Sequence, residues 1–252
     1  MSDSLIFIND DAINPQDLFL NEDWKIVRNS EDQNDRIYHI FVENKRLNWI
    51  VKISDKSKHT EIESENYKKL VGVKGIPKIL AYGISKKLNY LIMSRAEGID
   101  LFEYCKNNGT FTEEKLKIIS RKLLNILKSI HKKRVIHKDI KPENIIYEEK
   151  KNDVSIIDFE EKFTSDYQSP EQIKNKKLTY KTDSWSLGIT LYFLYHGKLP
   201  FQNEKEILND NIEFSNETSE EFRDFVNCLC DKNIHNRYSP EEALNHVWFD
   251  TD

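Results

Sequence analysis

The residues best suited to chemistry lie in one polar stretch near the middle of the chain, His137-Lys138-Asp139-Ile140-Lys141-Pro142-Glu143-Asn144. An aspartate and an asparagine in one loop, with a lysine between them, can meet at one phosphate-transfer centre. Asp139 can accept a hydroxyl proton, Lys141 can neutralise a moving phosphoryl group, and Asn144 can hold a divalent cation. A polar loop that only closes a turn is the alternative interpretation of the same stretch.

A second carboxylate follows the apolar run Val154-Ser155-Ile156-Ile157, which predicts a strand that ends at Asp158 and Phe159. Carboxylate and amide oxygens suit Mg²⁺, a hard cation that keeps substrate phosphates among its ligands. We therefore expect Asn144 and Asp158 to be the metal ligands. Each motif alone is weak evidence, and the combination is much more specific.

The elements that must position these residues change in type near residue 97. Before it, short β-rich runs recur at Trp24–Val27, Ile37–Val42, Trp49–Ile53, Ile79–Tyr82 and Tyr90–Met93, with one helix-like stretch at Glu61–Leu70. After it, helical patterns dominate, beginning with Thr112 as the N-cap of an apolar-periodic helix. Further helices are expected at Thr182–His196, Glu204–Asn209, Ser219–Cys230 and Pro240–Asn245. We predict an α+β fold with a small β-rich lobe, a larger α-helical lobe and a cleft between them.

Composition narrows the class of protein. The chain has 252 residues with a net charge of −5, so it lacks the basic excess of a nucleic-acid binder. Its longest apolar stretches are too short to span a bilayer, and its N-terminus lacks the features of a signal peptide. Three cysteines form neither a disulfide framework nor a zinc pattern. We expect an intracellular monomer, cytoplasmic or nuclear, that binds neither nucleic acid nor membrane.

Together, the motifs resemble those of the eukaryotic-type serine/threonine protein kinases from about Trp24 to Phe249. The stretch from His137 to Asn144 resembles H-R-D-x-K-P-x-N, and Asp158-Phe159-Glu160 resembles D-F-G. Further matches are Ser169-Pro170-Glu171 to A-P-E, Asp183 to Gly188 to D-x-W-S-L-G, and Asn245 to Phe249 to H-P-W-F. Arg237 stands where the family has an arginine that pairs with the A-P-E glutamate.

This resemblance implies a bilobal protein-kinase-like fold with the active site in the cleft. Residues 1–23 would be an N-terminal extension, which either packs on the small lobe or binds a partner. The small lobe would cover about residues 24–96 and the large lobe about residues 97–252.

The resemblance also assigns the phosphate-binding lysine. Trp49-Ile50-Val51-Lys52 resembles V-A-I-K, which makes Lys52 the residue that grips the α- and β-phosphates. A lysine that ends an apolar strand is otherwise an ordinary edge charge. Its helix partner would be Glu63, in a helix that resembles that of casein-kinase-I-like kinases, with Glu61 and Glu65 as competitors.

The stretch from Leu91 to Gly98 resembles the kinase hinge. On that match Met93 is the gatekeeper, residues 94–96 offer backbone groups to adenine, Asp100 reaches the ribose and Ile146 packs under the base. The full set of expected nucleotide contacts is Ile37, Ile50, Lys52, Met93, Ser94, Ala96, Asp100 and Ile146.

Two positions indicate the type of substrate. Lys141 within the catalytic loop is the serine/threonine-kinase form. Thr164 occupies the position of a threonine that, in the family, hydrogen-bonds near the catalytic aspartate and that tyrosine kinases generally lack. The resemblance therefore implies transfer to serine and threonine hydroxyls.

The loop that covers the phosphates departs from the family. Aligning Ile37 with the family's valine puts Ser30, Asp32 and Asp35 where the family has three glycines, and Glu31 adds a further charge. One carboxylate ~5 Å from a phosphate, at an effective dielectric of ~20, costs roughly 3 kcal/mol. The sequence thus predicts weakened ATP binding, unless Mg²⁺ or an open loop relieves the repulsion.

The activation segment is the second departure. Only residues 160–163 separate Phe159 from Thr164, and Lys138 replaces the arginine that normally receives a loop phosphate. We infer that loop phosphorylation does not switch this protein. Glu160 replaces the D-F-G glycine and is expected to restrict backbone movement there.

Three hypotheses remain at this point. The leading one is a serine/threonine protein kinase that uses ATP and Mg²⁺ on a protein substrate. Its catalytic residues would be Asp139 as base, Lys141 as charge stabiliser, and Lys52 with Glu63 as the phosphate clamp. A pseudokinase that acts as a binding or scaffold module is the alternative, supported by the acidic, glycine-free loop. A small-molecule kinase is weaker, because Thr164 resembles protein-substrate machinery.

Overall fold

The structure is a computed structural model that describes residues 6–8, 24–27, 39–42, 49–55, 58–84, 88–160 and 163–250. The positions predicted for the phosphate-covering loop, Ser30, Glu31, Asp32, Asp35 and Ile37, lie outside the described residues. The chain divides into two compact units. The first unit contains the β-rich N-terminal elements together with Phe159 and Glu160. The second contains residues 73–76 and the elements that follow Ala96.

Among the described residues, the first unit has six strands and one helix. They are β1 (Ile6–Ile8), β2 (Trp24–Val27), β3 (His39–Val42), β4 (Trp49–Asp55), α1 (Lys58–Lys69), β5 (Ile79–Ile84) and β6 (Leu88–Ser94). One sheet has the strand order β1-β5-β6-β4, and β2 and β3 form a separate antiparallel pair. Within the first sheet, β4 runs antiparallel to β6, with Ile50 opposite Met93 and Lys52 opposite Leu91. The sheet therefore brings four of the predicted nucleotide residues, Ile50, Lys52, Met93 and Ser94, onto neighbouring strands.

Strand β1 is an element that the sequence analysis did not predict. It pairs in parallel with β5, with Ile6 opposite Ala81 and Ile8 opposite Gly83. Residues 6–8 thus join the first unit's sheet, while residues 1–5 and 9–23 of the predicted extension lie outside the described residues. The other strands and α1 overlap the β-rich runs and the helix-like stretch predicted from the sequence.

The second unit is mainly helical. Its helices are α2 (Leu101–Asn108), α3 (Glu113–Lys132), α4 (Pro170–Ile173), α5 (Tyr180–His196), α6 (Glu204–Asn209), α7 (Glu220–Leu229) and α8 (Pro240–Ala243). A three-stranded antiparallel sheet consists of β7 (Ile99–Asp100), β8 (Ile145–Glu148) and β9 (Asp153–Ile156). Single 3-10 turns occur at η2 (Pro142–Asn144), η3 (Glu149–Lys151), η4 (Ser165–Tyr167) and η5 (Val247–Phe249).

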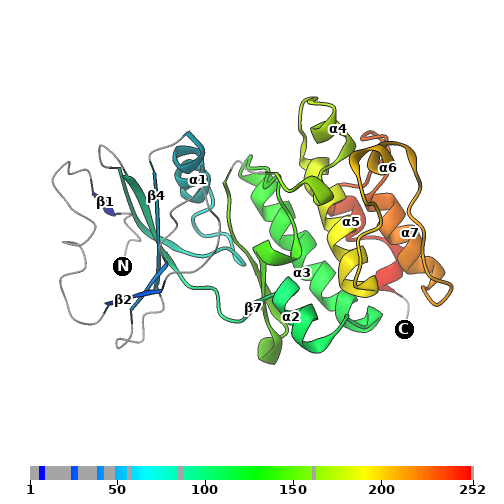
Figure 1. The fold of residues 1–252 in the computed structure, drawn as a ribbon, viewed down its shortest axis with the longest axis horizontal. Helices are drawn as coiled ribbons and strands as arrows, with labels where there is room; N and C mark the ends of the chain where they lie inside the picture. Colours follow the sequence, from blue (N-terminus) through cyan, green and yellow to red (C-terminus); the bar gives the residue numbers. More distant parts are fainter. Residues whose placement is uncertain are drawn as a thin grey trace. The chain divides into compact units, whose positions relative to one another are not determined.

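Helix α5 lies at the centre of this unit, between α3 and α7 (Figure 1). Its residues from Thr182 to Tyr192 are all buried, so every side of the helix is covered, and Trp185 is fully buried in it. At Gly188 an added Cβ would lie 2.4 Å from the Sγ of Cys230, so glycine is what lets this helix approach the end of α7 closely. Core packing thus holds α5 in place. Its first turn carries Asp183, which belongs to the candidate site.

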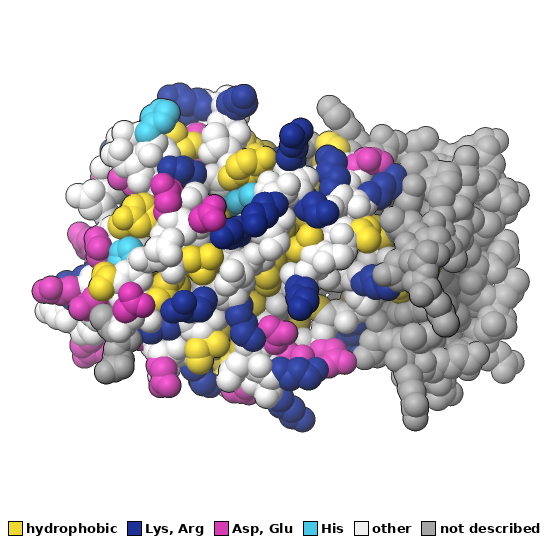
Figure 2. Space-filling view, turned by 180° about the vertical axis from the view of Figure 1, so that it is seen from behind, with side chains coloured by type: hydrophobic (Ala, Val, Ile, Leu, Met, Phe, Trp, Pro, Cys, Tyr) yellow, Lys and Arg dark blue, Asp and Glu magenta, His cyan; other side chains and the backbone are white. Residues whose placement is uncertain are grey.

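The surface of the described part carries both signs of charge. In Figure 2, Lys and Arg side chains are spread over the visible face with Asp and Glu side chains among them. This pattern agrees with the interleaved lysine and glutamate of the sequence. Among the described residues, no helix combines the length and the apolar character needed to cross a bilayer.

Candidate active site

The loop between α3 and η2 brings Asp139 and Lys141, two of the four predicted catalytic residues, together in the second unit. Asp139 is buried, and its Oδ1 accepts a hydrogen bond from the backbone N–H of Thr164 at 2.9 Å. Its Oδ2 accepts a hydrogen bond from Nδ2 of Asn144 at 3.1 Å and lies 3.3 Å from Nζ of Lys141. Lys141 also donates to Oγ1 of Thr164 at 2.7 Å. Four of the residues singled out by the sequence thus form one connected polar group around a single carboxylate.

Asp183, in the first turn of α5, holds the backbone of this loop in place. Its fully buried carboxylate accepts hydrogen bonds from the backbone N–H groups of His137 at 2.9 Å and Lys138 at 2.8 Å. Nε2 of His131 lies 2.8 Å from the same carboxylate. Burial alone would raise the pKa of Asp183, but these hydrogen bonds and the histidines nearby bring it below its ordinary value. The D-x-W-S-L-G motif located Asp183, but the sequence analysis gave it no role.

Lys138 itself adopts a φ of 75°, in the left-handed region that non-glycine residues rarely occupy. The carbonyl of Lys138 accepts a hydrogen bond from Nε2 of Gln172 at 3.0 Å, while its N–H is bound by Asp183. Hydrogen bonds between the backbone of Lys138 and the side chains of Asp183 and Gln172 therefore maintain the turn that precedes Asp139.

The two predicted metal ligands lie at neighbouring positions in the second unit. The backbone N–H of Ile157 donates to the carbonyl of Asn144 at 3.0 Å, which continues the pairing of β8 with β9. Asn144 uses its Nδ2 on Asp139, so its Oδ1 is the atom that can face a cation. Asp158 follows directly with a φ of 66°, which turns the chain sharply after β9. An amide oxygen and a carboxylate are ligands that fit Mg²⁺.

In the first unit, Nζ of Lys52 lies 3.0 Å from Oε1 of Glu63, and both side chains are buried. Glu63, Tyr67 and Leu70 are buried on one face of α1 and the turn that follows it, as the i, i+4, i+7 spacing requires. Glu65, one of the competing glutamates, is exposed and pairs with Lys68. The side chain of Glu61 is outside the described residues.

Glu160 gives Lys52 a second carboxylate partner, which the sequence analysis did not foresee. Its Oε1 forms an ion pair with Nζ of Lys52, and its side chain is 5% exposed. The preceding Phe159 is attached to α1, because its carbonyl accepts a hydrogen bond from Nδ2 of Asn66 at 3.2 Å. Its ring also meets Tyr67 edge-on with centroids 5.1 Å apart. No local signal could have revealed the pair, because it joins residues from distant parts of the chain.

The remaining predicted nucleotide residues lie in both units. Met93 is buried on β6, and Ile50 is half-buried on β4. The N–H of Ser94 donates to the carbonyl of Lys78 at 2.8 Å, so this N–H already has an acceptor within the first unit. Ala96 is half-buried.

In the second unit Asp100 is paired with Ile146 across β7 and β8. Asp100 is also the N-cap of α2, and its Oδ1 accepts the N–H of Glu103 at 2.8 Å. This residue has a structural role that the sequence analysis did not assign.

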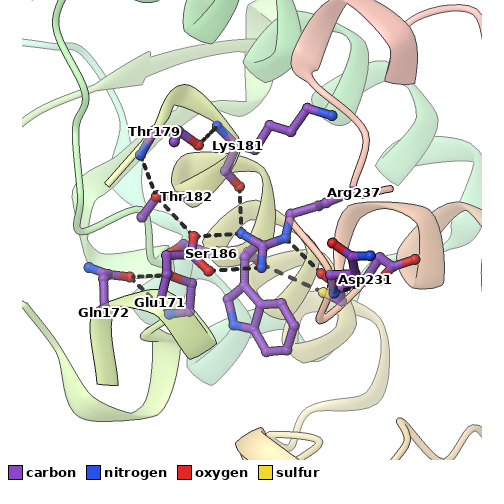
Figure 3. Close-up of polar contacts among 12 residues, drawn as sticks. Glu171, Gln172, Thr179, Lys181, Thr182, Ser186, Asp231 and Arg237 are labelled. Atoms are coloured by element: carbon purple, nitrogen blue, oxygen red, sulfur yellow. Dashed lines mark hydrogen bonds and ion pairs between the residues drawn. The ribbon is translucent and has the colours of Figure 1, made fainter. Parts of the chain in front are cut away.

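A buried ion pair joins the A-P-E-like segment to the C-terminal part of the second unit (Figure 3). Nη1 and Nη2 of Arg237 donate to the two carboxylate oxygens of Glu171 at 2.7 and 2.9 Å. The guanidinium also donates to the carbonyls of Lys181 and Asp231, and it stacks over the ring of Trp185. Burial alone would raise the pKa of Glu171, but the Arg237 guanidinium holds it below its ordinary value. The pairing predicted from the sequence is confirmed.

Comparison with known proteins agrees with this geometry. Residues 35–249 match the family model described as the protein kinase domain. The chain is 31% identical over 233 residues to a probable myosin light chain kinase of Dictyostelium discoideum, covering 79% of this chain and 74% of that protein. It is 31% identical over 177 residues to the serine/threonine-protein kinase ppk6 of Schizosaccharomyces pombe, covering 64% of this chain and 23% of that protein.

A solved structure is similar as well. The crystal structure of Rad53 1–466 in complex with AMP-PNP has a TM-score of 0.76 and 28% sequence identity, covering 90% of this chain and 66% of that one. The fold is thus that of a protein kinase domain. The chain belongs to the eukaryotic-type serine/threonine protein kinase family. It spans about a quarter of the length of ppk6 and about three quarters of the Dictyostelium relative.

Proposed function

We propose that this protein is a serine/threonine protein kinase that transfers the γ-phosphate of ATP to hydroxyl groups of a protein substrate. The observation that carries the proposal is the connected group of Asp139, Lys141, Asn144 and Thr164 around one buried carboxylate. The similarity to Rad53 in complex with AMP-PNP supports an adenine nucleotide as the phosphate donor.

In this proposal Asp139 orients the acceptor hydroxyl and accepts its proton. The N–H of Thr164 and Nδ2 of Asn144 hold the carboxylate in one orientation, so it does not have to reorganise during the transfer. Lys141 stands beside both Asp139 and Thr164, where its positive charge stabilises the phosphoryl group as it moves. In this arrangement Asp139 is the base, and Lys141 is the cation that stabilises the phosphoryl group.

The metal would be held by Oδ1 of Asn144 and the carboxylate of Asp158. Mg²⁺ held there would neutralise negative charge on the nucleotide phosphates. Lys52, kept in place by Glu63, would bind the α- and β-phosphates. Because the N–H of Ser94 already donates to the carbonyl of Lys78, a hinge donor to adenine would come from residues 95–96.

A transfer assay with two aspartate variants tests the proposal. Wild type should phosphorylate a generic acceptor protein with labelled Mg²⁺-ATP, and Asp139→Asn should reduce the rate by at least about a hundredfold, because the base is lost. Asp153→Asn is the matched control, because Asp153 is 61% exposed and pairs with Lys122 on the surface. Equal rates for wild type and Asp139→Asn would refute the assignment.

Phosphoamino-acid analysis of the product tests the specificity. Thr164 and Lys141 form the hydrogen bond that supports a serine/threonine preference. We expect phosphoserine and phosphothreonine in the product. Phosphotyrosine as the main product would contradict this part of the proposal.

We also propose that phosphorylation of the activation segment is not needed. Asp183 and Gln172 already fix both sides of the peptide at Lys138, and the N–H of Thr164 already contacts Asp139. Complete dephosphorylation by a phosphatase, verified by intact mass, should therefore leave the transfer rate unchanged. A loss of activity that returns on re-phosphorylation would refute this.

A pseudokinase is the second candidate function. The observation that favours it is the ion pair between Glu160 and Lys52, which engages the lysine that should bind phosphates. Thermal melting with and without Mg²⁺-ATP separates the two functions. A catalytic kinase should be stabilised by the nucleotide and show transfer that depends on Asp139, whereas a scaffold should show no such transfer.

A further inference from the structure

Glu160 contacts the ammonium group that the proposed function assigns to the nucleotide phosphates. Nζ of Lys52 lies 3.0 Å from Glu63 and also pairs with Glu160. A lysine ammonium has three N–H donors, so two carboxylates occupy most of its capacity. The three side chains together carry one more negative than positive charge. A phosphate that approaches Lys52 therefore meets a carboxylate already bound to it.

Burial strengthens the Coulombic attraction within this ion pair relative to a surface pair. The exposed fractions are 9% for Lys52, 3% for Glu63 and 5% for Glu160. Water screens such charges much less than it screens charges at the surface. The attraction between Glu160 and Lys52 and the repulsion between Glu160 and an incoming phosphate are both strengthened by this burial.

The position of Glu160 is also determined by its neighbours. Asn66 and Tyr67 of α1 hold Phe159 through a hydrogen bond and a ring contact. The same helix carries Glu63. Helix α1, Phe159 and Glu160 therefore approach Lys52 as one packed group within the first unit.

We propose that Glu160 is a built-in competitor of the nucleotide, which holds Lys52 in the nucleotide-free protein and lowers its affinity for ATP. This inference depends on the proposed role of Lys52 in phosphate binding. When a ligand binds only a minor state, its apparent affinity falls in proportion to the population of that state. If the state with Glu160 displaced holds about 1–10% of the molecules, the affinity for ATP is reduced about 10- to 100-fold.

The opposite role for Glu160 makes the opposite prediction. A second anchor that keeps Lys52 correctly placed for phosphates would strengthen nucleotide binding. Removing the charge of Glu160 would then weaken the affinity for ATP. The sign of the change therefore decides between competitor and anchor.

The test measures the dissociation constants of Mg²⁺-ATP and of adenosine by calorimetry on the full chain. Glu160→Gln removes the charge at nearly constant size, and Glu160→Gly restores the residue of the family motif. Both variants should bind ATP about 10- to 100-fold more tightly than wild type. Adenosine has no phosphates, so its affinity should stay within about twofold. The matched control is Glu65→Gln. Glu65 is exposed on α1, the helix that carries Glu63, and it pairs with Lys68.

Two results would overturn the inference while leaving the proposed function intact. One is unchanged or weaker ATP binding by both Glu160 variants when wild type binds ATP. The other is an equal change for ATP and adenosine, which would show a general structural effect. If neither wild type nor the variants bind ATP, the assignment of a nucleotide site fails and the inference fails with it.

Discussion

The substitution Asp183→Asn tests how the second unit supports the catalytic loop. Oδ2 of Asp183 receives hydrogen bonds from the N–H of His137 at 2.9 Å and from Nε2 of His131 at 2.8 Å, and Oδ1 receives the N–H of Lys138 at 2.8 Å. An asparagine has one oxygen and one NH₂ group. If its oxygen keeps the two bonds at Oδ2, its NH₂ faces the N–H of Lys138, and a buried donor loses its acceptor.

The loss of folding free energy expected for Asp183→Asn follows from these hydrogen bonds. An unsatisfied buried donor costs about 1–3 kcal/mol, and neutral hydrogen bonds are weaker than those to a carboxylate by about 1 kcal/mol each. The total is on the order of 3 kcal/mol, which lowers Tm by roughly 6–12 °C for a chain of this size. The loop preceding Asp139 should also become less ordered, so the transfer rate should fall while the affinity for ATP changes little.

Denaturant unfolding followed by tryptophan fluorescence measures the stability, since Trp185 and Trp248 are fully buried in the same unit. The matched control is Asp224→Asn, because Asp224 is 68% exposed. A loss below about 1 kcal/mol for Asp183→Asn, or one no larger than that of the control, would refute the reasoning.

The pH dependence provides a second check on Asp183. Because its pKa lies below the ordinary value in the folded protein, its ionised form stabilises the fold above about pH 4. That stabilisation is lost as the pH falls through the folded pKa. The stability difference between wild type and Asp183→Asn should therefore shrink on acidification, and a difference that grows would contradict the assignment.

Three other predictions concern the second unit. Arg237→Met leaves Glu171 buried without its partner and should cost about 3–5 kcal/mol in denaturant unfolding; a loss under about 1 kcal/mol would contradict this. Gly98→Ala places a Cβ 2.2 Å from the backbone oxygen of Tyr147 at a φ of 117°, so Tm should drop by several degrees, whereas an unchanged Tm would disprove the clash. Since the pKa of Glu171 is lowered, wild type should lose stability below about pH 4, and Glu171→Gln should flatten that dependence; an unaltered pH profile would rule this out.

Much of the candidate site could be predicted because its residues are close in sequence. Asp139, Lys141 and Asn144 share one loop, so their spacing alone brings them together. The helical period also favours Glu63 over Glu65 as the partner of Lys52. Glu63 lies four residues before the buried Tyr67 and therefore shares its face of the helix. Strands β2 to β6, β9 and most helices overlap the predicted ranges because alternating and helical apolar patterns report burial directly.

Other features depend on contacts between distant segments, which no local pattern encodes. The sequence placed Asp183 in a motif, but only the packing of α5 under the loop shows that its carboxylate binds the backbone of His137 and Lys138. Likewise, β1 joins β5 across a long stretch of chain, and its three residues give too short a pattern to predict a strand.

Glu160 shows the difference most clearly. From the sequence it was only the residue that replaces a glycine and restricts the backbone. Tertiary structure decided that its carboxylate reaches Lys52, because α1 holds Phe159 and thereby directs the next residue to that lysine. The sequence by itself determined the family, the fold class and the candidate residues for phosphate transfer, since these are written in local motifs and periodicity. Only the folded chain decided which charges those residues meet, because electrostatic pairing depends on distance in space and on burial.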